Sequence, residues 1–111
     1  MKIVGTALLF ALLAPFHAAA QTLTADALLD RITGQTFEIR RMAMRMEMTF
    51  QPDGSIAGRG PLGTMTGSWA VERDQLCMEL PRIGRRCSAV TAEQDGSLVF
   101  GDGQRMMPVY G

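Results

Sequence analysis

The residues with the clearest chemical potential are methionines that alternate along one stretch of the chain. Met42, Met44, Met46 and Met48 occupy every second position before Phe50, so an extended strand would place their side chains on one face. Thioethers are soft ligands that favour Cu(I) and need no deprotonation, which makes Met44, Met46 and Met48 candidate ligands for Cu(I) or Ag(I). The same pattern suits an apolar core face or an exposed, adaptable surface for a partner. All three alternatives stay open on the pattern alone.

The first twenty residues are typical of an export signal. Lys2 precedes an apolar run over residues 3–13, and Ala18, Ala19 and Ala20 form a small-residue cleavage site. The apolar run is too short for a stable membrane-spanning helix. We therefore expect cleavage before Gln21, a periplasmic or secreted location, and no integral membrane segment after cleavage.

Removal of this segment limits the chemistry of the mature chain. It takes away His17 and Lys2, which are the only histidine and the only lysine. An imidazole base, a Ser-His-Asp triad and an ordinary zinc site are then excluded. The remaining 10 arginines face 11 acidic residues, and this near-neutral balance argues against a nucleic-acid partner. We expect no enzymatic activity and no cofactor, with Cu(I) as the alternative.

The two cysteines predict a disulfide, because paired cysteines in an exported chain are normally oxidised. A hairpin centred near Arg82 places Cys77 opposite Cys87. Closing this loop stabilises the fold by about 3 kcal/mol in the chain-entropy model. On that register Leu76, Met78 and Leu80 form the apolar face, so either the disulfide lies on the outer face or the register differs.

One helix is predicted, from Ala25 to about Thr33. Thr24 is a suitable N-cap residue and Gly34 a suitable residue after the helix end. A single apolar face is expected from residues at helical spacing, namely Ala25, Leu28, Leu29 and Ile32.

The rest of the chain predicts an antiparallel meander, because turn signals recur about every ten residues. Phe37 and Ile39 are apolar at odd positions whereas the methionines are at even ones, so a bulge, bend or turn is needed between Arg40 and Ala43. Trp69 is expected to pack toward the methionine strand. The predicted strands lie near 35–40, 44–51, 55–60, 64–71, 75–80, 85–91, 97–100 and 105–109.

These elements predict a mainly β fold with one domain over residues 21–111. The short N-terminal helix packs on the antiparallel β-meander, which closes into a small lipocalin-like barrel or a half-barrel.

Two further groups of charged residues allow both a binding and a structural interpretation. Five arginines, namely Arg40, Arg41, Arg45, Arg85 and Arg86, are candidates for an anion-binding patch, or for a solvated face paired with Glu38, Glu47 and Glu79. Three Asp-Gly pairs follow residues 52, 94 and 101. Their spacing does not match a calcium loop, and turns require this dipeptide.

The order of several short motifs resembles small exported proteobacterial proteins of the domain-of-unknown-function kind. The shared pattern is G-x-T-F, F-x-P-D-G, G-x-W-x-V, L-C and C, which covers the chain from about Leu28 to Val90. This resemblance implies a lipocalin-like or half-barrel sheet and no established activity. The chain is also similar, more weakly, to periplasmic barrels that inhibit metalloproteases, whose N-terminal segment enters the protease cleft; residues 21–24 correspond to it here.

We therefore expect a non-enzymatic periplasmic binding or accessory protein, whose partner is a protein or a small ligand. The alternatives are a Cu(I) or Ag(I) carrier that uses Met44, Met46 and Met48, and a protease inhibitor.

Overall fold

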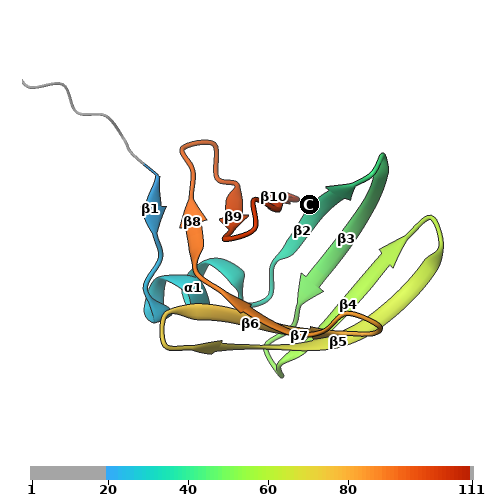
Figure 1. The fold of residues 1–111 in the computed structure, drawn as a ribbon, viewed down its shortest axis with the longest axis horizontal. Helices are drawn as coiled ribbons and strands as arrows, with labels where there is room; N and C mark the ends of the chain where they lie inside the picture. Colours follow the sequence, from blue (N-terminus) through green and yellow to red (C-terminus); the bar gives the residue numbers. More distant parts are fainter. Residues whose placement is uncertain (1–19, 111) are drawn as a thin grey trace, which may run out of the picture.

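The computed structural model describes residues 20–110 of the 111-residue chain. The expected signal peptide, apart from Ala20, lies outside the described residues. Ten strands form one antiparallel sheet, and one short helix packs against it (Figure 1). The fold class predicted from the sequence is confirmed. Between residues 20 and 110, no helix has the length and apolar character needed to cross a membrane.

The elements follow one another with short connections. In chain order they are β1 Gln21–Thr22, α1 Ala25–Ile32, β2 Thr36–Arg41, β3 Met44–Phe50, β4 Ser55–Gly60, β5 Gly63–Glu72, β6 Gln75–Leu80, β7 Gly84–Ser88, β8 Val90–Ala92, β9 Leu98–Phe100 and β10 Arg105–Pro108.

The sheet is so strongly curved that two strands adjacent in the chain lie at or near its opposite edges. The strand order is β1-β8-β9-β10-β2-β3-β4-β5-β6-β7, in which β2 to β7 form a simple meander. β7 is one edge of this order and β8 lies near the other, yet only Ala89 separates them in the chain. The result is a half-barrel with a concave inner face (Figure 1).

A tight turn after Arg41 explains why the apolar alternation shifts from odd to even positions near Arg40. Met42 and Ala43 have φ angles of 51° and 68°, and they connect β2 to β3 in a register that pairs Arg41 with Met44. Two successive positive φ angles are typical of the type I′ hairpin turn. The expectation that Met42 shares a face with the other methionines is wrong, because it lies in this turn and is 90% exposed.

Aromatic side chains fill the centre of the core. The ring of Phe50 makes edge contacts with Phe37 and Trp69, each at a centroid distance of 5.8 Å. The indole Nε1 of Trp69 donates a hydrogen bond of 2.9 Å to the carbonyl of Gln51, which satisfies the one polar atom of this side chain. Trp69 therefore packs on the methionine strand, as predicted.

The helix covers one end of the half-barrel. Thr24 is its N-cap residue, and its hydroxyl accepts a hydrogen bond from the backbone nitrogen of Ala27. Leu28 and Ile32 are fully buried. Leu29 was predicted to share their face, but it is 44% exposed, because a helix of eight residues buries only a narrow stripe against the sheet.

Two other differences concern the strands. The strand expected over residues 85–91 is divided at Ala89 into β7 and β8, because the chain leaves β6 there and begins to pair with β9. β1 was not predicted. Its two residues carry no alternating pattern, and it exists because Gln21 and Thr22 pair with β8.

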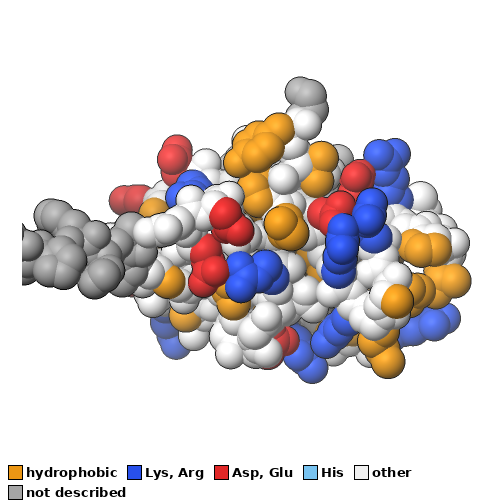
Figure 2. Space-filling model, turned by 90° about the horizontal axis from the view of Figure 1, so that it is seen from above, with side chains coloured by type: hydrophobic (Ala, Val, Ile, Leu, Met, Phe, Trp, Pro, Cys, Tyr) orange, Lys and Arg blue, Asp and Glu red, His pale blue; other side chains and the backbone are white. Residues whose placement is uncertain are grey.

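Three hairpin turns lie together at one end of the molecule (Figure 1, right). We call residues 41–44, 60–63 and 80–84 the hairpin rim. Seen from above, this end shows hydrophobic side chains among arginines (Figure 2, right).

Candidate ligand-binding pocket

A cavity of about 250 Å³ lies inside the curl and extends to the hairpin rim. Its walls are almost entirely apolar, as in typical small-molecule sites. Strands from both halves of the sheet contribute to it, because the curl brings β6 and β7 opposite β2 and β3. The lining residues come from the inner face and the rim: Ile39, Arg41, Met44, Met46, Met48, Met65, Met78, Leu80, Ile83, Gly84, Arg86, Phe100, Asp102 and Gln104.

The three methionines singled out in the sequence all line this cavity. Along β3 their exposure decreases from Met44 at the rim, which is 43% exposed, through the half-buried Met46 to Met48, which is 3% exposed. β3 therefore forms a wall that runs from the mouth to the floor of the pocket. The alternation that predicted a shared face is confirmed for these residues.

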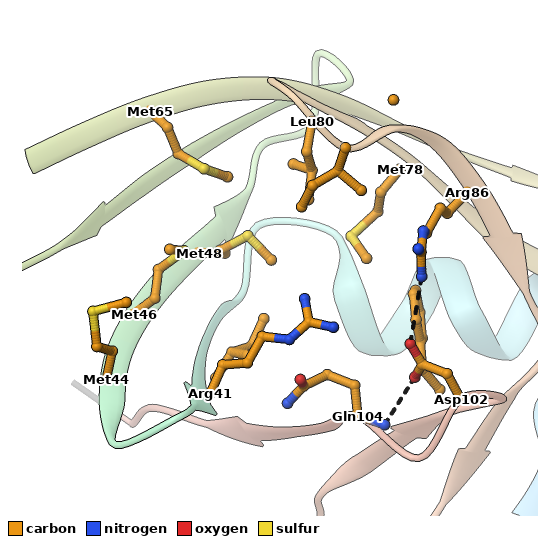
Figure 3. A pocket seen from close by; sticks show the side chains of 14 residues that line it. Arg41, Met44, Met46, Met48, Met65, Met78, Leu80, Arg86, Asp102 and Gln104 are labelled. Carbon is orange, nitrogen blue, oxygen red and sulfur yellow. Dashed lines mark hydrogen bonds and ion pairs between the residues drawn. The ribbon is translucent and has the colours of Figure 1, made fainter. Parts of the chain in front are cut away.

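Two further methionines complete the lining from the opposite strands. Met65 on β5 and Met78 on β6 extend toward Met48 across the pocket (Figure 3). Sequence reasoning placed Met78 on the apolar face of its strand and did not consider Met65 as a site residue. It missed both as pocket residues, because only the curl shows that these faces meet.

Gly58 makes room for the side chain of Met65. In the sheet, Gly58 pairs with Met48 on one side and Met65 on the other. A Cβ atom at Gly58 would lie 2.9 Å from Met65 Cγ and 3.3 Å from its Cε. Met65 thus lies over the glycine and reaches toward β3, which lets thioethers from two strands share the same space.

Polar groups are confined to the mouth. Arg86 and Asp102 approach within 3.8 Å, and the backbone nitrogen of Gln104 donates a 2.9 Å hydrogen bond to Asp102. Arg41 extends into the opening (Figure 3) and has no ion-pair partner among residues 20–110. A ligand with an apolar body and an anionic end would place its body against the apolar walls. Its anionic end would then lie beside the free guanidinium of Arg41 at the entrance.

The predicted arginine patch is divided by the structure. Arg41 and Arg86 line the pocket, whereas Arg40 and Arg45 share the carboxylate of Glu38 at 3.0 and 3.6 Å. Of the expected acidic partners, Glu47 pairs with Arg59 instead. The paired, solvated alternative is thus confirmed for Arg40 and Arg45, whereas anion binding stays a prediction.

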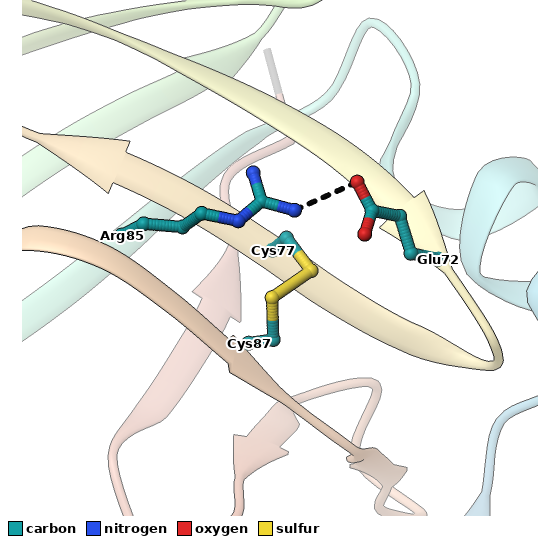
Figure 4. The surroundings of a disulfide bond; sticks show 4 residues. All are labelled: Glu72, Cys77, Arg85 and Cys87. Atoms are coloured by element: carbon teal, nitrogen blue, oxygen red, sulfur yellow. Dashed lines mark hydrogen bonds and ion pairs between the residues drawn. A yellow bond between two sulfur atoms is a disulfide. The ribbon is translucent and has the colours of Figure 1, made fainter.

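The disulfide lies on the opposite face of the sheet. Cys77 and Cys87 are directly paired in register and bonded, so the predicted pairing is confirmed. Arg85 reaches past the bond to Glu72, at 2.7 Å (Figure 4). Leu76 and Met78 point inward, where they are buried, which places the disulfide on the outer face as the alternation allowed.

The chemistry available in the pocket is that of apolar contact and thioether donation. No cluster of three or more His, Cys, Asp or Glu side chains able to hold a metal ion occurs within residues 20–110. A metal ion in this cavity would be bound by methionine sulfur, and a soft ion such as Cu(I) or Ag(I) fits that donor set.

The protein resembles none of the known proteins with which it was compared: no family model, no curated protein and no solved structure matches the chain.

Proposed function

We propose that this chain is a non-enzymatic, periplasmic or secreted protein that binds a small apolar or amphipathic ligand in its methionine-lined pocket. The observation that carries the proposal is the apolar cavity of about 250 Å³, bounded by five methionines and closed at its floor by Met48 and Phe100. Methionine side chains adapt to different apolar shapes, which suits ligand binding better than a rigid aliphatic wall would.

Export and a binding role are supported by the sequence. The first twenty residues are typical of a signal peptide, and the Cys77–Cys87 disulfide requires an oxidising compartment to form. Between residues 20 and 110 there is no histidine or lysine to act as a base, and we therefore propose binding rather than catalysis.

The first test is a binding measurement with one neutral and one anionic probe, decanol and decanoate. We expect a saturable 1:1 complex by native mass spectrometry and titration calorimetry, with decanoate the tighter ligand because Arg41 faces the mouth. The double substitution Met46→Gln/Met65→Gln should weaken binding about tenfold, because buried amides lose water without gaining partners.

The matched control is Met107→Gln. Met107 is 43% exposed on β10 and does not line the pocket, so its substitution should leave the affinity unchanged. Absence of saturable binding by both probes, or equal binding by the pocket variant and the wild type, would refute the proposal.

The second candidate is a Cu(I) or Ag(I) carrier that uses Met44, Met46 and Met48. Its support is the presence of Met65 and Met78 on the facing wall, since several thioethers in one cavity can share a soft ion. Anaerobic competition between the protein and a chromophoric chelator, with Ag(I) as the redox-stable probe, tests it. We expect Met44→Leu/Met46→Leu/Met48→Leu to abolish Ag(I) binding and Met42→Leu/Met107→Leu to retain it. Equal binding by both variants would exclude this site.

The protease-inhibitor alternative stays a prediction. Gln21 and Thr22 pair with β8, and the backbone nitrogen of Leu23 donates to the carbonyl of Val90. No observation on the described residues favours that function.

A further inference from the structure

The hairpin rim exposes one large apolar side chain at each of its three turns. Met42 is 90% exposed, Leu62 88% and Ile83 48%. Met44, beside the first of these turns, is 43% exposed. None of the four belongs to the buried core; Met42 and Leu62 extend from the end of the half-barrel, and Met44 and Ile83 also line the mouth of the pocket.

Turn chemistry does not explain these residues. The Met42–Ala43 turn has two positive φ angles, a conformation that favours Asn and Gly and costs energy for a residue with a longer side chain. Arg82, next to Ile83, also has a positive φ of 67°. Strained turns that carry exposed apolar side chains point to a function at the surface.

Arginines surround these apolar tips. Arg41 and Arg82 have no ion-pair partner among residues 20–110, and Arg40 and Arg45 share one carboxylate. The far end of the molecule is acidic instead, with aspartates on α1 and in the turns at residues 53 and 95. The rim therefore combines positive charge with exposed apolar groups (Figure 2, right).

We propose that the hairpin rim docks on the surface of an anionic phospholipid bilayer. Met42, Leu62 and Ile83 enter the interfacial layer, and the neighbouring guanidinium groups bind lipid phosphates. An anionic bilayer accounts for both features, because its interfacial layer accepts protruding apolar side chains and its phosphates pair with the guanidinium groups of Arg41 and Arg82, which have no ion-pair partner among residues 20–110. The pocket extends to the same end, so a ligand could pass between bilayer and pocket without crossing water.

The test is co-flotation of the purified, disulfide-bonded protein with vesicles of phosphatidylcholine alone or mixed with phosphatidylglycerol. We expect binding to the anionic vesicles, weaker binding to the neutral ones, and a decrease as salt is raised. Met42→Ser/Leu62→Ser should lower vesicle affinity about tenfold or more. The matched control Leu29→Ser/Tyr110→Ser removes side chains that are 44% and 83% exposed away from the rim and should retain affinity.

The charge contribution is tested in the same assay. Arg41→Gln/Arg82→Gln should reduce binding to anionic vesicles, whereas Arg31→Gln/Arg73→Gln, outside the rim, should not. The pocket variant Met46→Gln/Met65→Gln should still bind vesicles, which separates failure of this inference from failure of the proposed function. The inference is overturned by absence of vesicle binding, by equal effects of the rim and control variants, or by light scattering that shows the rim instead joining two copies of the chain.

Discussion

Two glycines in the meander set how closely neighbouring strands and side chains approach, and they differ in what surrounds them. At Gly58 the nearest obstacle to a Cβ atom is the flexible side chain of Met65. At Gly67 it is the backbone carbonyl oxygen of Glu79, at 2.5 Å, with Leu80 Cδ2 at 2.9 Å. A side chain can rotate away, whereas a paired strand cannot move without losing hydrogen bonds.

The two substitutions to alanine should therefore have different effects. We expect Gly67→Ala to lower the free energy of unfolding by about 1–3 kcal/mol, in the range of overpacked cores. Gly58→Ala should lower the free energy of unfolding by less than Gly67→Ala does. It should instead push the side chain of Met65 into the pocket and so weaken decanoate binding. Urea denaturation and calorimetric titration of both variants measure the two effects. Equal destabilisation by both variants would contradict this account.

At the scale of elements, one turn positions the helix. The carboxylate of Asp74, in the turn between β5 and β6, accepts a 2.6 Å hydrogen bond from the backbone nitrogen of Ala25 at the start of α1. This nitrogen has no partner within the helix, and a negative charge at a helix N-terminus is favourable. The turn thus caps an element that lies 49 residues away in sequence.

Two glycine substitutions separate the effect of this capping hydrogen bond on stability from the effect of the turn conformation. Arg73 and Asp74 both have positive φ angles, 52° and 61°, so glycine suits either position. We expect Asp74→Gly to be less stable than Arg73→Gly by about 1 kcal/mol, the typical contribution of a cap. Thermal unfolding of the two variants gives the difference, and equal stability would show that the contact contributes nothing.

Two turns are built alike around an aspartate. The carboxylate of Asp53 accepts hydrogen bonds from the hydroxyl and backbone nitrogen of Ser55, and Asp95 accepts the same pair from Ser97. These bonds favour the charged form and hold the pKa of each aspartate below its usual value. The nearby guanidinium of Arg105 further favours the charged form of Asp95 and so also lowers its pKa.

This arrangement makes part of the stability depend on pH. Because the folded pKa lies below the unfolded value of about 3.9, the contribution is complete above that pH and is lost as pH falls through the folded pKa. We expect Asp53→Asn/Asp95→Asn to flatten the acid limb of the melting temperature plotted between pH 2 and 5. Asp30→Asn, on the exposed face of α1, controls for removal of a carboxylate. An unchanged acid limb in the double variant would argue against this role.

At the scale of the whole molecule, the disulfide secures a free edge of the sheet. Within the described part of the chain, β7 pairs with β6 alone, and the Cys77–Cys87 bond joins these two strands on the face away from the pocket. The bond therefore supports the pocket wall that includes Gly84 and Arg86 without entering the cavity.

Loss of this bond should weaken the fold and leave the ligand chemistry intact. We expect Cys77→Ser/Cys87→Ser to lower the free energy of unfolding by about 3 kcal/mol, from the closed loop alone. Under conditions where the variant remains folded, decanoate should still bind. Denaturation with and without reductant measures the first effect, and a wild type unaffected by reductant would contradict it.

The local part of the structure was predictable and the long-range part was not. The hairpins of the meander depend on local signals, such as the turn residues Pro52-Asp53-Gly54 and the alternation before Phe50. Their strands could therefore be predicted from the sequence. The pairing of β10 with β2 and of β1 with β8 joins distant segments, and no local pattern encodes it. The pocket depends on that pairing, so Met44, Met46 and Met48 were found as one wall, whereas Phe100 and Gln104 were missed.

The strand order also determines the sequence in which the molecule can assemble. Each pair from β2 to β7 joins neighbouring strands through a tight turn, so its contacts are local and close at little entropic cost. β8 to β10 can be aligned with β2 only after the chain has passed Ala89, and β1 pairs only once β8 is in place. We therefore expect the meander to form the folding nucleus, with the closing strands and the pocket they complete arriving last.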